Sequence, residues 1–362
     1  MSINSSKTAR YGKGFVALVM AVIFLGGISF SNPATAADEK TINLKFSSAY
    51  MPPEPPNIQT NRVMEMVEKK TNGRVKIKRF MGGALGGIHE QLGLVSSGAV
   101  DMIPLHYDQY PQQLPLHKIL NADQNVSEEQ ALTNIIAIMY EISETMALFE
   151  EEQKKNNIKV LYPGCMGVTG VTARIPVKSL ADLKGKKVNV ITSYQRDFFK
   201  ELGWIPVNVK IPELYEALSR GVLDAIFMST GAVIPLKWYE VGKTHLLLGK
   251  PVVFSQPLTF NRDRWNSLPE DIQKAFLEAS LDTAHWSIEG DRMMAEKTYG
   301  LFKERGVPVI DISQEEKDMF FEAISRHATK DWLDNAKAAG VGDKTPVIQK
   351  YWDDMKWGKW KK

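Results

Sequence analysis

The six histidines are the first residues to consider for catalysis or metal binding, because imidazole serves both purposes. They stand at positions 89, 106, 117, 245, 285 and 327, and no two have the i, i+4 spacing of a helical metal site. The sequence contains no G-x-S-x-G, H-E-x-x-H, paired C-x-x-C or EF-hand loop. A catalytic site that is assembled only in space leaves no such motif in a sequence. The motifs therefore favour a binding protein over an enzyme, and they predict no metal and no cofactor.

The glycines of MGGALGG, residues 81–87, offer a second kind of chemistry. Glycine lets a backbone approach a ligand closely, and the helix expected from about His89 to Ser97 would present its N-terminus to an anion. The spacing of the glycines matches neither the Walker loop nor G-x-G-x-x-G. A tight strand-to-helix turn explains them equally well, so the loop does not by itself predict a nucleotide site.

The stretch from Pro176 to Met228 indicates how such loops are positioned, because apolar runs alternate there with helical patterns that end at glycines. Strands are expected at 187–191, 205–209 and 224–228, with helices at 194–202 and 213–220. Residues 42–80 show the same order of strand, helix and strand. This alternation predicts an α/β fold in which parallel strands carry binding sites at their carboxyl ends.

The first 36 residues predict a cleaved signal peptide and an exported protein. Three cations precede an apolar run from Phe15 to Phe30, and the small residues of ATA, 34–36, favour cleavage after Ala36. The run of about 16 residues is short of the roughly 20 that a membrane-spanning helix needs. The residue directly after the cleavage position is Ala37 rather than a cysteine, so a lipid anchor is not expected.

Composition excludes several partners and cross-links. The whole chain has 45 Lys and Arg against 42 Asp and Glu, and removal of Lys7, Arg10 and Lys13 with the signal leaves 42 of each. A mature chain without net charge favours neither nucleic acid nor an anionic membrane surface as partner. Cys165 is the only cysteine, so no internal disulfide can form. It is expected to be a small buried side chain rather than a reactive thiol.

A long helix is expected after the capping-box pattern Ser267-x-x-Glu270, with Pro269 at its start and an end near Gly306. At 1.5 Å per residue it spans roughly 55 Å, which is longer than one domain of this size, so it should bridge two domains. After the signal peptide, 1–36, we expect domain I at 37–160 and domain II at 161–260. Residues 261–362 would form the bridging helix and C-terminal helices that return over both domains.

Six segments in order resemble the extracytoplasmic solute-binding proteins of tripartite ATP-independent periplasmic (TRAP) transporters, DctP type. They are LKFSS, LGG…LGLVSSGAVDM, PVKSLADLKGKKVNV, PELYEALSRGVLDA, KWYEVGK and TFNRDRWNSLPEDIQKAF. The resemblance covers nearly the whole mature chain. It implies a two-domain periplasmic solute-binding-protein fold with a hinge, and a long helix that runs along both domains. It also implies delivery of a small organic solute to membrane permease subunits.

The same resemblance locates a site whose residues depart from the family pattern. The family commonly binds organic acids through an arginine just after the GLK segment, and this chain has Asn189 there. The family also often has an arginine in the region of Val168, and this chain has none there. Where the family has an asparagine, this chain has Met228 at about that position, and where it has an aromatic residue before PELY, this chain has Ile211. These neutral or apolar residues predict an organic acid that is larger, aromatic or weakly charged.

Alternatives stay open at this stage. Arg174 or Arg196 could supply the missing charge, and the protein could instead be a periplasmic ligand sensor or an exported enzyme on the same fold. The sequence does not determine the oligomeric state. The predicted solute-binding residues are Tyr50, His89, His106, Tyr107, Val168, Arg174, Asn189, Thr192, Ile211, Met228, Ser229, Trp238 and Ser255.

Overall fold

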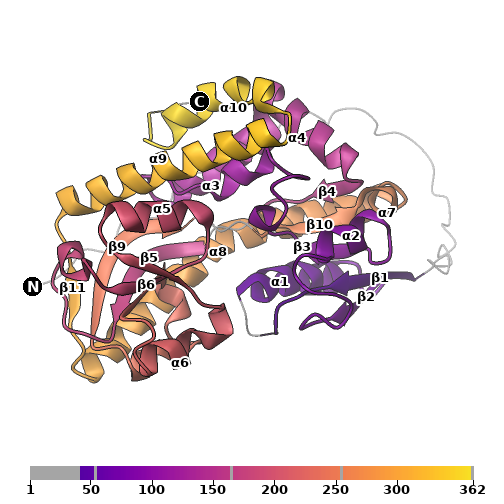
Figure 1. Ribbon diagram of the computed structural model, residues 1–362. Coiled ribbons are helices and arrows are strands. Elements are labelled where there is room, and N and C mark those ends of the chain that lie inside the picture. Colours follow the sequence, from indigo (N-terminus) through magenta and orange to yellow (C-terminus); the bar gives the residue numbers. More distant parts are fainter. Residues whose placement is uncertain (1–40, 53–54, 164–165, 253–255, 360–362) are drawn as a thin grey trace, which may run out of the picture. The chain divides into compact units, whose positions relative to one another are not determined.

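The computed structural model describes residues 41–52, 55–163, 166–252 and 256–359 (Figure 1). The predicted export signal, Cys165 and Ser255 lie outside the described residues. Two β-sheets and the helices that cover them make up the described chain, which confirms the predicted α/β class.

The first sheet has the strand order β2-β1-β3-β10-β4. Strand β1 is parallel to β2 and β3, whereas β10 is antiparallel to β3 and β4. Its elements are β1 (Ile42–Ser47), α1 (Pro55–Lys70), β2 (Val75–Phe80), α2 (Gln91–Ser96), β3 (Met102–Pro104), β4 (Ile158–Val160) and β10 (Leu258–Asn261).

The second sheet has the strand order β11-β9-β5-β8-β6-β7. Strand β6 is parallel to β7 and β8, and β5 is antiparallel to β8 and β9. Its elements are β5 (Met166–Ala173), β6 (Lys187–Val190), α5 (Ser193–Glu201), β7 (Ile205–Asn208), α6 (Leu214–Ser219), β8 (Ala225–Ser229), β9 (Thr244–Val252) and β11 (Val309–Asp311). The strands and helices predicted between Pro176 and Met228 are confirmed.

The two sheets share one repeated unit of strand, helix, strand, helix and strand. It consists of β1 to β3 in the first sheet and of β6 to β8 in the second, and in each case the first strand lies between the other two. In the first sheet the carboxylate of Asp101 accepts a hydrogen bond from the backbone N–H of Lys45, over 2.6 Å. In the second sheet Asp224 accepts one from the backbone N–H of Lys187, over 2.9 Å. Each aspartate therefore ties the start of the third strand to the first strand. The next residues pair in the same way in both sheets, Phe46 with Met102 and Val188 with Ala225.

The apolar clusters show that the two helices of each unit lie on opposite faces of their sheet. Phe198 and Phe199 of α5 belong to the largest cluster, whereas Leu214 and Leu218 of α6 belong to a separate cluster that includes Trp238. In the first sheet, α1 and α2 are divided between two clusters in the same way. This is the arrangement expected when right-handed crossovers leave the central strand in opposite directions.

The predicted long helix is confirmed as α8 (Glu270–Glu304), 35 residues without a break. It contacts α1 beside the first sheet and β5 of the second sheet (Figure 1). Its N-cap is Pro269, and the predicted capping box at Ser267 does not form. The Ser267 hydroxyl donates instead to the carbonyl of Arg264 in the preceding short helix α7 (Arg262–Asn266).

The remaining helices pack around these units. They are α3 (Glu128–Ile136), α4 (Ser143–Lys155), α9 (Gln314–Ala338) and α10 (Thr345–Met355). Helix α9 packs against α5, and α10 packs against α4 (Figure 1). Among the described residues no single helix is long and apolar enough to cross a membrane, and only the bent pair 128–141 and 143–155 passes that test when its helices are counted together.

Candidate functional site

The second sheet has a topological switch point, where the chain changes direction. Helix α5 leads from β6 outward to β7, and α6 then brings the chain back across β6 to β8. Ligands of open α/β sheets bind at such switch points, beyond the carboxyl ends of the strands. In the parallel ladder β6 and β8 pair only at Val188 and Ala225. The two strands separate after that pair.

Asn189 lies at this separation. Its Oδ1 accepts a hydrogen bond from the backbone N–H of Phe227, over 2.8 Å, and so replaces a ladder bond between β6 and β8. The residue is 1% exposed, and its Nδ2 has no hydrogen-bond partner among the described residues. One half of the amide is therefore used by the fold, and the other half is a neutral donor.

The first sheet has the same kind of switch point between β1 and β3, which pair only at Phe46 and Met102. His106 and Tyr107 follow β3 and are buried. Burial lowers the pKa of His106 from its usual value of 6.5, so its imidazole is neutral near pH 7. The ring of Tyr107 lies 5.3 Å from that of His117.

Two further predicted residues stand near the first sheet. Tyr50 follows β1 and is half-buried, and its carbonyl accepts a hydrogen bond from the Asn57 side chain over 2.7 Å. His89 precedes α2 and is exposed. The structure therefore brings Tyr50, His106 and Tyr107 to the carboxyl ends of β1 and β3, while His89 lies in the loop that leads into α2.

Thr192 is the N-cap of α5 and lines a hollow of about 300 Å³ at the carboxyl ends of β6 and β7. Gln195 stabilises this turn, because its Oε1 accepts the backbone N–H of Ile191 over 3.0 Å. Arg196 and Asp197 line the same hollow and are exposed. Among residues that the structure describes, Arg196 has no hydrogen bond or ion pair, so its charge is available at the N-terminus of α5.

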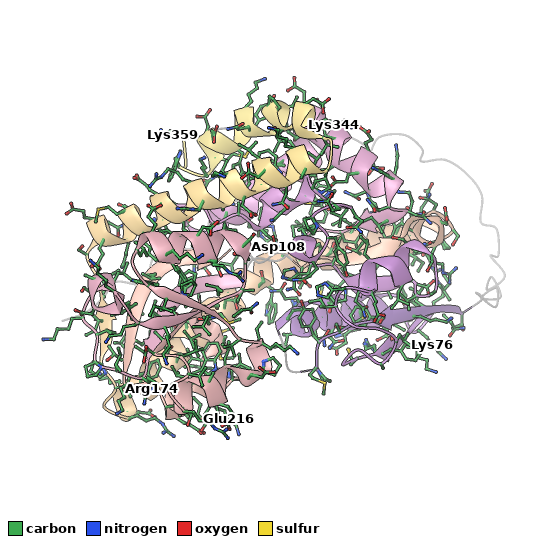
Figure 2. All side chains as sticks on the ribbon, in the orientation of Figure 1. Lys76, Asp108, Arg174, Glu216, Lys344 and Lys359 are labelled. Atoms are coloured by element: carbon green, nitrogen blue, oxygen red, sulfur yellow. The ribbon has the colours of Figure 1, made fainter. Side chains whose placement is uncertain are left out.

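Arg174, the other candidate for a charge partner, lies at the opposite end of the sheet. It follows Ala173, which pairs with Ala225 at the start of β8. Its guanidinium is 3.9 Å from the carboxylate of Asp224 and packs beside Gly221, just after α6 (Figure 2). The structure therefore does not bring Arg174 to the carboxyl ends of β6 and β8.

The remaining predicted residues are on or beside β8. Met228 and Ser229 end this strand, where they pair with Gly170 and Thr169 of β5, and Val168 is the next residue of β5. Met228 and Ile211 are half-buried and pack against the apolar cluster around Trp238. Trp238 itself is 1% exposed and belongs to that cluster.

A half-buried acidic residue lies close to Ser229 and was not predicted from the sequence. Asp291 of α8 accepts a hydrogen bond from the backbone N–H of Gly167, over 2.7 Å. Asp291 and Ser229 both lie beside Gly231, because a Cβ added to that glycine would be 3.6 Å from Asp291 Oδ1 and 3.5 Å from Ser229 Oγ. Burial raises the pKa of Asp291 to about 7. A single acid in the middle of a long helix carries no local signal, so only the packing reveals it.

Comparison with known proteins agrees with this architecture. The family model of bacterial extracellular solute-binding proteins, family 7 (DctP), matches residues 46–333. The C4-dicarboxylate-binding protein DctB of Bacillus subtilis is 22% identical over 288 residues, which cover 78% of this chain and 80% of that protein.

Solved structures agree as well. A TRAP periplasmic solute-binding protein from Desulfovibrio salexigens in an open complex superposes with a TM-score of 0.73 and 22% identity, covering 87% of this chain and 95% of that one. A second protein from Desulfovibrio salexigens, with bound orotic acid, has a TM-score of 0.71 and 20% identity, covering 87% and 99%.

The predicted family and the expectation of a binding protein rather than an enzyme are thus confirmed. Proteins of this family bind small organic solutes outside the cytoplasm and work with membrane permease subunits. The chain belongs to family 7 of the bacterial extracellular solute-binding proteins, the DctP family of TRAP transporters.

Proposed function

We propose that this protein captures an organic acid of low charge and considerable apolar surface in the periplasm, and delivers it to the two membrane subunits of a TRAP transporter. The observation that carries this proposal is the state of Asn189. It is a neutral residue at the switch point between β6 and β8, and its Nδ2 has no partner among the described residues. A neutral N–H donor can hold a carboxylate or a carbonyl, but it discriminates less for charge than an arginine fork.

One positive charge is still available to the solute from Arg196. Its guanidinium and the N-terminus of α5 line one hollow, and both favour an anionic group. Asp197 in the same hollow limits the total positive charge. This combination supports one carboxylate rather than two.

Apolar contact makes up for the reduced charge. Met228 and Ile211 lie on the side of the second sheet that α6 covers, and both are only partly buried. Each square ångström of apolar surface that a solute covers contributes about 25 cal/mol. An aromatic or otherwise bulky acid would use this surface, whereas a C4-dicarboxylate would not.

Relatives illustrate both possibilities. A structural neighbour from Desulfovibrio salexigens holds orotic acid, which is an aromatic monocarboxylate, and the Bacillus subtilis relative is a C4-dicarboxylate-binding protein. The neutral residue at 189 favours the first type for this chain.

Calorimetry with orotate, succinate and malate tests the proposal. We expect orotate or a similar bulky monocarboxylate to bind at least tenfold more tightly than succinate. Arg196→Ala should weaken that binding about tenfold, because it removes the available charge. Arg174→Ala is the matched control and should leave the affinity unchanged. Tight binding of succinate or malate to the unmodified protein would contradict the proposal.

A further inference from the structure

We propose that the hydroxyl group of Ser47 is a second solute-binding group, the counterpart in the first sheet of Asn189 in the second. This inference rests on the proposed function, because it assumes that the solute binds at the two switch points. Nothing in the sequence pattern singled out Ser47, which ends β1 as one of two adjacent serines.

The repeated unit makes Ser47 and Asn189 equivalent. The aspartate bonds place Lys45 opposite Asp101 in the first sheet and Lys187 opposite Asp224 in the second. The backbone N–H of each aspartate returns a bond to the carbonyl of the same lysine, over 2.9 Å in the first sheet and 2.8 Å in the second. The register of the first and third strands is thereby the same in both halves.

Counting along that register identifies the partners. Two residues after Lys187 comes Asn189, and two residues after Lys45 comes Ser47. Three residues after Asp224 comes Phe227, and the corresponding residue after Asp101 is Pro104. In the second sheet the backbone N–H of Phe227 donates to Asn189 Oδ1. In the first sheet Pro104 has no N–H to donate.

Ser47 is consequently left without the bond that its counterpart makes. The residue is 0% exposed, and its Oγ has no hydrogen-bond partner among the described residues. The next residue, Ser48, differs, because its Oγ accepts the backbone N–H of Tyr50 over 3.1 Å. A buried hydroxyl that makes no hydrogen bond destabilises a fold, and such groups in native proteins often have a functional partner.

The two switch points therefore offer matching chemistry to a solute. Each has one buried, neutral group with unused hydrogen-bonding capacity, the Nδ2 of Asn189 and the Oγ of Ser47. A hydroxyl can donate to a carboxylate or carbonyl oxygen and can accept from an N–H or hydroxyl group. The solute that fits is an acid with a polar group of its own besides the carboxylate. Orotate, with its ring carbonyls and N–H groups, is a suitable probe.

Ser47→Ala and the matched control Ser48→Ala test this inference in two measurements. The first is denaturant unfolding without solute. We expect Ser47→Ala to keep or raise the unfolding midpoint, because it removes an unpaired buried hydroxyl, and Ser48→Ala to lower it. A lower midpoint for Ser47→Ala would show that the hydroxyl has a structural partner such as a buried water, and would overturn the inference.

The second measurement is orotate calorimetry on both variants and on the unmodified protein. We expect Ser47→Ala to weaken orotate binding about tenfold and Ser48→Ala to leave it within about twofold. Equal affinities of Ser47→Ala and the unmodified protein would reject the role of Ser47 alone. If the unmodified protein binds neither orotate nor the other acids, the proposed function fails and this inference fails with it.

Discussion

The hydroxyl of Tyr194 donates a hydrogen bond to the carboxylate of Asp123 over 3.1 Å, and both side chains are buried. The bond joins α5 of the second sheet to the segment that follows the 3₁₀ turn His117–Asn121. Asp123 is 0% exposed, and burial together with the negative charge of Asp108 raises its pKa to about 7. It has no ion pair among residues in the described ranges, so it is stable as a neutral acid.

We predict that the free energy of unfolding decreases as the pH rises from about 5 to about 7. In the unfolded chain Asp123 ionises near its ordinary pKa of 3.8, whereas in the folded chain it stays protonated until about pH 7. Ionisation of the unfolded state thus favours unfolding across this range, by about 1.4 kcal/mol for each pKa unit of difference. Asp291, whose pKa is also raised to about 7, contributes with the same sign.

Urea unfolding at pH 5 and pH 7.5 measures the effect, and Asp123→Asn separates the two acids. The amide cannot ionise but can still accept the bond from Tyr194, so the variant should lose part of the pH dependence. An identical pH dependence in the variant and the unmodified protein would mean that Asp123 does not titrate in this range.

Gly167→Ala should destabilise the protein by about 1–3 kcal/mol. An added Cβ would lie 2.5 Å from the Cβ of Asp291, and α8 cannot move away without disturbing its other contacts. Gly300→Ala is the control. Gly300 is on α8, like Asp291, and no atom lies within 4 Å of a Cβ added there. It should be neutral or stabilise by about 1 kcal/mol, because alanine favours helix. Chemical denaturation of both variants checks the contrast, and equal effects would contradict it.

Asp224→Ala and Asp101→Ala should each destabilise the protein by roughly 1.5–3 kcal/mol, because each leaves a strand N–H without its charged acceptor. The exposed residue Glu216 serves as control, since its ion pair with Arg220 lies on the surface of α6. Glu216→Ala should change the unfolding free energy by less than about 0.5 kcal/mol. A loss of similar size in all three variants would show that the aspartate bonds have no special role.

The mature protein should begin at Ala37. The cations, the apolar run and the ATA sequence of residues 34–36 all precede the first described strand, so cleavage would leave the described fold complete. N-terminal sequencing of the exported protein measures this directly. A periplasmic protein that retained Met1 would contradict the prediction.

Sequence alone determined the elements whose signals are local. The strands and helices between Pro176 and Met228 follow from apolar periodicity and from glycines at helix ends, and α8 follows from a long helical pattern without proline. Periodicity and stop signals act over a few residues, so they survive without knowledge of the rest of the chain. The family resemblance likewise depends on contiguous segments.

Only the tertiary structure decided which side chains share the site. Arg174 and Arg196 were equal candidates in the sequence, yet the antiparallel pairing of β5 with β8 carries Arg174 to the far end of the sheet. Trp238 was predicted to contact the solute because its side chain is aromatic, but it packs into an apolar cluster. Asn189 accepts a hydrogen bond from the backbone N–H of Phe227, whereas Ser47 finds no donor because its counterpart partner is Pro104. Both outcomes depend on the register of parallel strands, which are joined by long crossovers. That register depends on burial of side chains from distant segments, and no short stretch of sequence encodes it.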